Sequence, residues 1–191
     1  MRKVVFDIET RNIFSDIGGY DPERLDIAVV AIHDSESDTY TSYLAEELTK
    51  LWPILERADM LIGFNSDHFD IPLLNKYYPG DLTKIKSLDI LREIKDTYGR
   101  RMKLEQLAEG TLGEKKSGIG TEATNWWKQG LVEKVREYCL DDVRLTKGLY
   151  DYARANNKLI FKEGGKLNEI KLDTTNWETE GKHKLTFSLP F

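Results

Sequence analysis

Two acidic residues, separated by a single residue, lie in an apolar stretch near the start of the chain, VVFDIET at residues 4–10. Side chains alternate along a strand, so Asp7 and Glu9 share one face of the expected strand, and Phe6 and Ile8 share the other. Two carboxylates on one rigid face can hold a metal ion. The same pattern is also typical of a strand whose polar face meets water, and this stretch alone favours that simpler interpretation.

A third carboxylate, Asp70, lies in GFNSDHFDIPLL at residues 63–74, between an expected strand and an expected helix. An aspartate just before a helix is typical of an N-cap, which accepts hydrogen bonds from first-turn amides. A metal ligand is the alternative. Asn65 fits a turn, and we interpret His68 as a loop side chain because no second histidine lies at ligand spacing.

A fourth carboxylate, Asp142, belongs to the longest helical pattern, residues 132–157. One face of that pattern is formed, at steps of four and three, by Leu131, Val135, Tyr138, Asp142, Leu145 and Leu149. A carboxylate on a buried face is costly unless it is paired or binds a metal. Tyr138 precedes Asp142 by one turn, so its phenol can reach the same spot. A partner Arg or Lys, or a partly exposed face, remains an alternative.

Clustered carboxylates repel one another, by roughly 4 kcal/mol for two unit charges 4 Å apart at a surface-like dielectric. Cations remove this penalty. Because the four acids offer only hard oxygen ligands, Mg²⁺ or Mn²⁺ fits them, and the sequence offers no soft ligands for zinc near them. The single cysteine, Cys139, is interpreted as a small packed residue.

Hydrophobic periodicity predicts the elements that must position these acids. Strands are expected at residues 4–8, 25–34, 39–44, 60–65 and 85–91, and helices at 46–58, 70–78, 104–113 and 132–157. Residues 11–24 are rich in turn signals and are expected to form an ordered loop. These elements predict an α/β sheet with antiparallel members and helices on its faces.

The last part of the chain has a different pattern. Residues 158–173 alternate on either side of Gly164-Gly165, which predicts a hairpin, and residues 183–191 could add an edge strand. We therefore divide the chain into a domain at residues 1–157 and a β extension at residues 158–191 packed on it. The extension is a candidate contact for substrate, for a protein partner or for self-association.

Composition limits the class of protein. The net charge of −5 disfavours indiscriminate nucleic-acid binding, but leaves room for a local site where metals, lysines and arginines meet phosphate. No stretch approaches the roughly 20 apolar residues of a membrane helix, and the N-terminus does not resemble a signal peptide. With a single cysteine, these features lead us to expect a cytoplasmic protein without a membrane contact.

The three acidic motifs resemble those of the DEDD exonucleases, the DnaQ-like branch of the ribonuclease H-like superfamily. FDIET resembles the first motif, GFNSDHFDIPLL the second and YCLDDVRLT the third. The sequences of the second and third motifs are most similar to those of the exonuclease domain of family B DNA polymerases. The connecting stretches KSLDIL and MKLEQLAEGTLGEKK resemble the same domain. The resemblance covers roughly residues 1–155. It implies a ribonuclease H-like mixed sheet, with antiparallel first strands followed by parallel ones.

The resemblance also implies a subtype. One subtype carries a histidine five residues before the last aspartate, and that position is Glu137 here. The other carries a tyrosine four residues before it, which matches Tyr138. The chain is therefore similar to the tyrosine subtype.

By the same resemblance, two Mg²⁺ or Mn²⁺ ions would be held by the four acids Asp7, Glu9, Asp70 and Asp142. Paired ions of this kind clamp the attacking and leaving oxygens of an in-line displacement. Tyr138 would orient the attacking water, and Thr10 and Asn65 would help seat the terminal nucleotide.

The predicted activity is 3′-to-5′ hydrolysis of single-stranded nucleic acid, DNA in preference to RNA, with release of 5′-mononucleotides and a role in DNA repair. A structure-selective endonuclease and a catalytically silent nucleic-acid-binding or adaptor module are the alternatives. The Tyr-x-x-x-Asp helix argues against the endonuclease, and the presence of all five residues argues against the silent module.

Two further groups could contact the strand. Trp126 and Trp127 could stack on bases, although packing against the core is the favoured interpretation. The candidate phosphate contacts are Arg100, Arg101, Lys103, Lys115 and Lys116, with a solvated face as an equal alternative.

Overall fold

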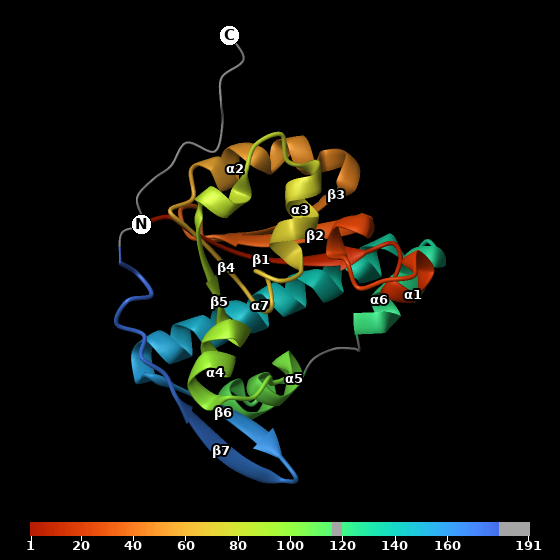
Figure 1. Ribbon diagram of the computed structural model, residues 1–191. Helices are drawn as coiled ribbons and strands as arrows, with labels where there is room; N and C mark the ends of the chain where they lie inside the picture. Colours follow the sequence, from red (N-terminus) through yellow and green to blue (C-terminus); the bar gives the residue numbers. More distant parts are fainter. Residues whose placement is uncertain (116–119, 180–191) are drawn as a thin grey trace.

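The computed structural model describes residues 1–115 and 120–179 (Figure 1). Its centre is a five-stranded sheet in the order β3-β2-β1-β4-β5, formed by β1 (Lys3–Thr10), β2 (Ile27–Asp34), β3 (Thr39–Leu44), β4 (Met60–Gly63) and β5 (Lys86–Asp89). The first three strands pair antiparallel, whereas β4 pairs parallel to both β1 and β5. The predicted mixed sheet, antiparallel first and parallel afterwards, is therefore confirmed.

Helices cover both faces of the sheet. One face carries α2 (Trp52–Glu56) and α3 (Asp70–Tyr77), and the other carries the long helix α7 (Val132–Asn156), as Figure 1 shows. The chain also forms α1 (Phe14–Ile17), α4 (Ile90–Tyr98), α5 (Leu104–Leu107) and α6 (Gly120–Lys128). Shorter helical turns lie at Pro22–Arg24, Ala45–Lys50, Leu82–Lys84 and Ala108–Leu112.

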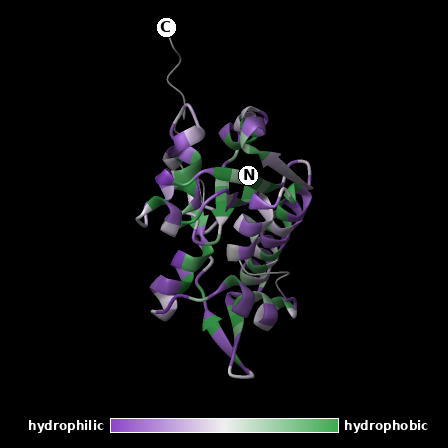
Figure 2. Ribbon diagram, turned by 90° about the vertical axis from the view of Figure 1, so that its right-hand side faces the viewer, coloured by the Kyte–Doolittle hydropathy of each residue, from purple (hydrophilic) through white to green (hydrophobic). Residues whose placement is uncertain are grey.

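The alternation of β1 sends its side chains into two separate cores. Phe6 and Ile8 pack with residues of α2 and α3, whereas Val5 packs with residues of α7 and α5. Hydrophobic residues accordingly concentrate on the central strands, and hydrophilic ones on the outer turns of the helices (Figure 2). Asp7 and Glu9 lie on the same face as Val5, so β1 presents them towards α7.

Several expected boundaries shift for identifiable reasons. The helix expected at residues 46–58 begins late, at Trp52, because Pro53 fits only the first turn of an α-helix. The expected loop at residues 11–24 contains α1 and a short helical turn. The segment with Trp126 and Trp127 forms α6 rather than a loop. Leu131 precedes α7 and is 45% exposed, so the predicted buried face begins at Val135.

The predicted C-terminal hairpin consists of β6 (Lys158–Glu163) and β7 (Lys166–Lys171), joined at Gly164 and Gly165, both with positive φ. Leu159, Phe161 and Ile170 pack into the core that also contains residues of α7. The edge strand expected at residues 183–191 lies outside the described residues. The division into 1–157 and 158–191 stays a prediction.

Among the described residues, no helix combines the length and the apolar character that a membrane span requires.

Candidate active site

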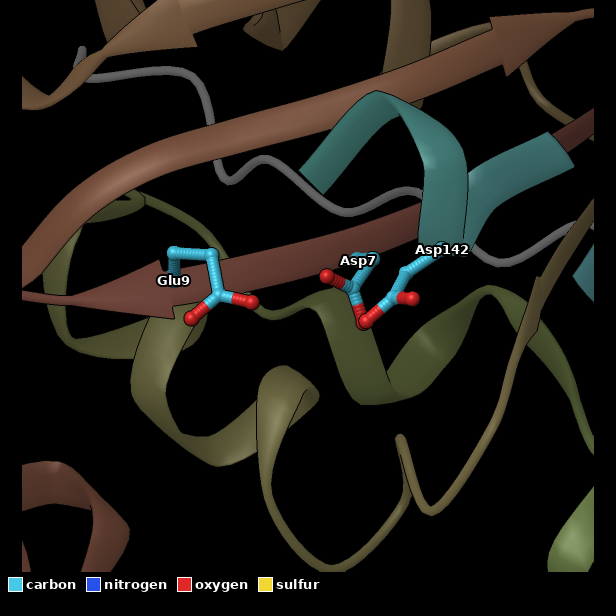
Figure 3. A group of neighbouring side chains, drawn as sticks. All are labelled: Asp7, Glu9 and Asp142. Carbon is cyan, nitrogen blue, oxygen red and sulfur yellow. The ribbon is translucent and has the colours of Figure 1, made fainter. Parts of the chain in front are cut away.

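Three of the predicted carboxylates meet at one point between β1 and α7. Each of Asp7, Glu9 and Asp142 has a carboxylate oxygen within 4.8 Å of one from each of the others. Figure 3 shows the carboxylates of Asp7 and Asp142 next to each other, with Glu9 further along the same strand. Glu9 is 9% exposed and Asp142 is 3% exposed. Three acids are thus gathered in a place where water screens their charges poorly.

The position of each acid follows from the element that carries it. β1 is the central strand of the sheet, and its pairing with β2 through residues 7 and 9 fixes the direction of Asp7 and Glu9. On the other side, β4 pairs only with residues 3–5 of β1. The register of β1 against β2 shifts between Glu9 and Thr10, an irregularity of the kind that often re-aims side chains beside active sites. α7 crosses the same face of the sheet and brings Asp142 opposite Asp7.

Cys139 is a contact that the sequence did not predict. Its Sγ lies 3.3 Å from the carbonyl oxygen of Asp7 and 3.4 Å from Oδ2 of the same residue, so the thiol donates to Asp7. Burial raises the pKa of Cys139, and the negative charges of Asp7, Glu9 and Asp142 raise it further. The thiol therefore stays protonated and acts as a donor to Asp7.

Asp70 is the first residue of α3, and Phe69 occupies the N-cap position, so the N-cap interpretation of Asp70 was wrong. Its side chain is buried. The pKa of Asp70 is raised well above its usual value, first by burial and then by the charges of Asp7 and Asp89, while hydrogen bonds from its own N–H and that of Ile8 act in the opposite direction. Asp70 is thus a fourth acid beside β1, where it accepts from the N–H of Ile8 and is influenced by the charge of Asp7.

Tyr138 is 2% exposed and lies one turn before Asp142 on the same face of α7. Its ring packs edge-on against Trp126 of α6, with ring centres 5.6 Å apart. The ammonium of Lys134 lies 3.9 Å from the centre of the Trp126 ring. This packing holds Tyr138 beside the acids. It also gives Trp126 a structural role.

Trp127 is also engaged within the fold. The guanidinium of Arg11 lies 4.9 Å from the centre of its ring. Both tryptophans therefore pack on the fold, in agreement with the favoured interpretation, although on a helix rather than on a loop.

The two predicted substrate contacts differ in their surroundings. The hydroxyl of Thr10 donates to the carbonyl of Asn12 at 2.8 Å, and its own carbonyl accepts from Thr124 Oγ1 at 3.2 Å. Asn65 has a φ of +66°, and its Oδ1 accepts from Arg101 at 2.6 Å. Thr10 is therefore turned towards its own loop, whereas Asn65 faces the surface beside Arg101. Their role in seating a nucleotide stays a prediction.

Asp89 is a second residue that sequence reasoning missed. Its Oδ1 accepts from the backbone N–H of Asn65 at 2.8 Å and of Leu91 at 3.0 Å, and its Oδ2 accepts from Asp67 at 3.2 Å. The carboxylate therefore caps α4 and also fixes the loop that leads to Asp70. Its position in KSLDIL, at the junction of a strand and a helix, was the available signal.

The predicted phosphate contacts are scattered. Arg100 forms an ion pair with Glu163 at 2.8 Å, and Lys103 and Lys115 are exposed. Arg101 contacts Asn65, and Lys116 lies outside the described residues. Of these five, Arg101 is the one that the structure places beside a predicted site residue.

The donor set fits a divalent metal. Every ligand atom offered is a carboxylate oxygen, which suits Mg²⁺ or Mn²⁺ rather than zinc. Like charges this close and this buried would destabilise the fold without a compensating cation. Asp7, Glu9 and Asp142 are the residues that would hold the ion. Asp70 is not part of this group, although the charge of Asp7 acts on it.

A family model described as the RNase_H superfamily matches residues 4–154. The chain therefore belongs to the RNase H superfamily, and the matched range includes all four acids and Tyr138. No curated protein sequence matches the chain.

Among solved structures, the chain is similar to a family B DNA polymerase from the hyperthermophilic archaeon Pyrobaculum calidifontis. The TM-score is 0.62 and the sequence identity 21%, over 81% of this chain and 24% of the polymerase. The chain thus spans about a quarter of the polymerase it matches, and at this identity the likeness establishes a shared fold.

Proposed function

We propose that the protein is a metal-dependent 3′-to-5′ exonuclease of the tyrosine subtype, acting on single-stranded ends. The observation that carries this proposal is the convergence of Asp7, Glu9 and Asp142 within 4.8 Å, with Asp70 and Tyr138 beside them. Membership of the RNase H superfamily supports phosphodiester hydrolysis at this place in the fold. The structural likeness to a DNA polymerase supports DNA over RNA as the substrate.

Each residue has a defined part in the proposed reaction. Asp7, Glu9, Asp70 and Asp142 would hold two divalent ions. When bound, such ions supply the positive charge that stabilises the attacking and leaving oxygens of an in-line displacement. The Tyr138 hydroxyl, one turn from Asp142, holds the attacking water in line with the bond to be broken.

The products follow from that geometry. A bond forms between the water oxygen and the phosphorus of the last nucleotide, and the bond from phosphorus to the 3′ oxygen of the preceding nucleotide breaks. The 3′ oxygen takes up a proton and stays with the shortened strand. The terminal residue leaves as a 5′-mononucleotide.

Single-stranded DNA and RNA of one sequence, each labelled at the 5′ end, test the proposal. Each is incubated with the protein in Mg²⁺, Mn²⁺ or EDTA, beside the Asp7→Ala variant. We expect a ladder that shortens from the 3′ end with either metal, is absent in EDTA and in the variant, and forms faster on DNA. Internal cuts would replace the proposal by an endonuclease. Binding without cleavage would replace it by a silent nucleic-acid-binding module.

A further inference from the structure

A pocket of about 280 Å³ lies beside the candidate active site, at the edge of the sheet where β4 and β5 end. Its lining includes Asn65 and Asp67 from the loop after β4, Asp89 at the end of β5, Arg92 and Lys95 of α4, and Arg101. The C-terminal ends of parallel strands are where α/β folds commonly bind ligands. Apart from the predicted contact of Asn65 with the terminal nucleotide, the proposed reaction gives this pocket no role.

The acids of the pocket are already engaged. Asp89 accepts from four backbone N–H groups at 2.8–3.3 Å. Asp67 accepts from Ser87 and forms an ion pair with Arg92. Lys95 and Arg101, in contrast, have no carboxylate within ion-pair distance among residues 1–115 and 120–179. The pocket therefore presents an excess of positive charge on a protein whose net charge is −5.

The cationic wall is held in place. The Arg101 guanidinium donates to Asn65 Oδ1 at 2.6 Å, and the N–H of Asn65 donates to Asp89 at 2.8 Å. Asn65 thereby keeps its positive φ of 66°. A guanidinium held by a fixed partner loses less conformational freedom on binding, and its remaining N–H donors match the oxygens of a phosphate.

A short stretch of chain joins the wall of the pocket to Asp70 of the candidate active site. Residues 64–69 lead from its wall directly to Asp70, and the N–H of Phe69 donates to the carbonyl of Asn65 at 3.1 Å. Asp89 holds the same loop through the N–H groups of Asn65 and Asp67. The wall of the pocket and Asp70 therefore belong to one short segment, which leads from the end of β4 into α3.

We propose that this pocket binds a backbone phosphate of the nucleic-acid strand, away from the bond being cut, through Lys95 and Arg101. The assignment rests on the proposed function, because it requires a strand whose end lies at the acids. Phosphate contacts of this kind fix the register of a strand without reading its sequence. The released 5′-mononucleotide is the other possible source of a phosphate.

The test uses salt dependence, because each bound phosphate releases counterions. A labelled single-stranded oligonucleotide is titrated by fluorescence anisotropy between low and moderate salt, with the Asp142→Asn variant as background. Adding Lys95→Ala and Arg101→Ala should weaken binding about tenfold at low salt. The slope of log affinity against log salt should fall by about 0.7 for each phosphate that the protein no longer neutralises.

Lys84→Ala is the matched control. Lys84 is exposed and precedes β5, and Asp89 lies at the other end of the same strand. Lys84→Ala therefore removes one positive charge that does not line the pocket. We expect the slope of this control to match that of the background. Equal slopes for the double variant and the control, in proteins with unchanged circular dichroism, would overturn the proposal.

A second arm separates the two phosphate sources. Thymidine 5′-monophosphate and inorganic phosphate compete with the labelled strand in the background protein and in the double variant. Loss of mononucleotide competition with an unchanged strand slope would overturn the assignment in favour of a product site. A reduced slope for the double variant, together with a native protein that cleaves no strand in the ladder assay, would support the pocket and contradict the proposed function. The two failures are therefore distinguishable.

Discussion

The Sγ of Cys139 lies 3.4 Å from Oδ2 of Asp7, and this contact joins the long helix to the central strand where the acids converge. A neutral donor on a carboxylate orients it without competing for a cation. Cys139 therefore positions the carboxylate of Asp7, and its protonated thiol is not itself a metal ligand.

Replacing Cys139 by alanine should weaken metal binding. Partners that orient metal ligands typically contribute 10- to 100-fold in affinity, so we expect Cys139→Ala to lower Mn²⁺ affinity about tenfold in isothermal titration calorimetry. Cys139→Ser keeps a donor at the same place and should bind Mn²⁺ within about threefold of the native protein. Alanine and serine variants that both bind like the native protein would show that the contact only fills space.

Neutralising one acid should stabilise the metal-free protein and remove its response to metal. Asp142→Asn relieves repulsion with Asp7 and Glu9, and we expect the free energy of unfolding without metal to rise by about 1 kcal/mol, as is common for changes in strained active sites. Adding Mn²⁺ should raise the Tm of the native protein but not that of the variant. The measurement is thermal unfolding with EDTA or Mn²⁺. A variant less stable than the native protein in EDTA would argue against repulsion among these acids.

The hydroxyl of Tyr138 should matter for cleavage and little for metal binding. Tyr138→Phe keeps the ring that packs on Trp126, so we expect about a 10²-fold loss of cleavage rate, the low end for a group that positions a proton-transferring water. Calorimetry should give an unchanged Mn²⁺ affinity.

Tyr150→Phe is the control for this change, since Tyr150 is a buried tyrosine three turns further along α7 whose hydroxyl donates to Glu178. This variant should lose stability and retain the cleavage rate per folded molecule. Similar rates for both variants would remove Tyr138 from the reaction.

Gly63 should tolerate no larger residue. A Cβ there would lie 2.4 Å from the Cβ of Ser66, so Gly63→Ala must displace the loop at residues 64–69 that leads to Asp70. We expect a loss of about 1–3 kcal/mol in stability, as for other overpacked sites, measured by urea denaturation. Gly19→Ala, whose Cβ would meet only the flexible end of Arg24 at 3.4 Å, should change stability little. Equal effects would show that the loop can adjust.

Glu178 should make stability depend on pH in the acid range. Hydrogen bonds from Lys3 and Tyr150 lower the pKa of Glu178 to about 2. A lowered pKa means that the folded state favours the ionised form, so the contribution is complete above pH 4.5 and is lost as the pH falls towards 2. We expect it to be on the order of 1 kcal/mol, since the side chain is partly exposed. Urea denaturation between pH 2 and 6 should show a shallower slope for Glu178→Gln, and an unchanged slope would contradict this account.

The sequence predicted those parts of the fold and site that depend on local periodicity. Alternation along β1 placed Asp7 and Glu9 on one face, and helical spacing placed Tyr138 and Asp142 on one side of α7. The contact of Cys139 with Asp7 depends on how α7 crosses the sheet, which no local pattern encodes. The burial of Asp70 is also a tertiary property. The local sequence showed only an aspartate before a helix, which is typical of an N-cap.

Helix α6 was missed for a different reason. Its sequence, GTEATNWWK, contains threonine, asparagine and tryptophan, residues of modest helix propensity, and starts with a glycine. Packing of Trp126 against Tyr138 and of Thr124 against Thr10 stabilises it instead. Tertiary contacts of this kind override weak local propensity.

The central claim is that Asp7, Glu9 and Asp142 place a metal at the phosphate being cut. The most direct measurement uses a 5′-labelled DNA strand in which sulfur replaces a non-bridging oxygen of the last phosphodiester. Since sulfur binds Mg²⁺ poorly and Mn²⁺ better, we expect removal of the last nucleotide to be strongly slowed in Mg²⁺ and largely restored in Mn²⁺. Asp142→Asn should remain inactive in both. Cleavage that is insensitive to the sulfur, or that persists in EDTA, would contradict the account.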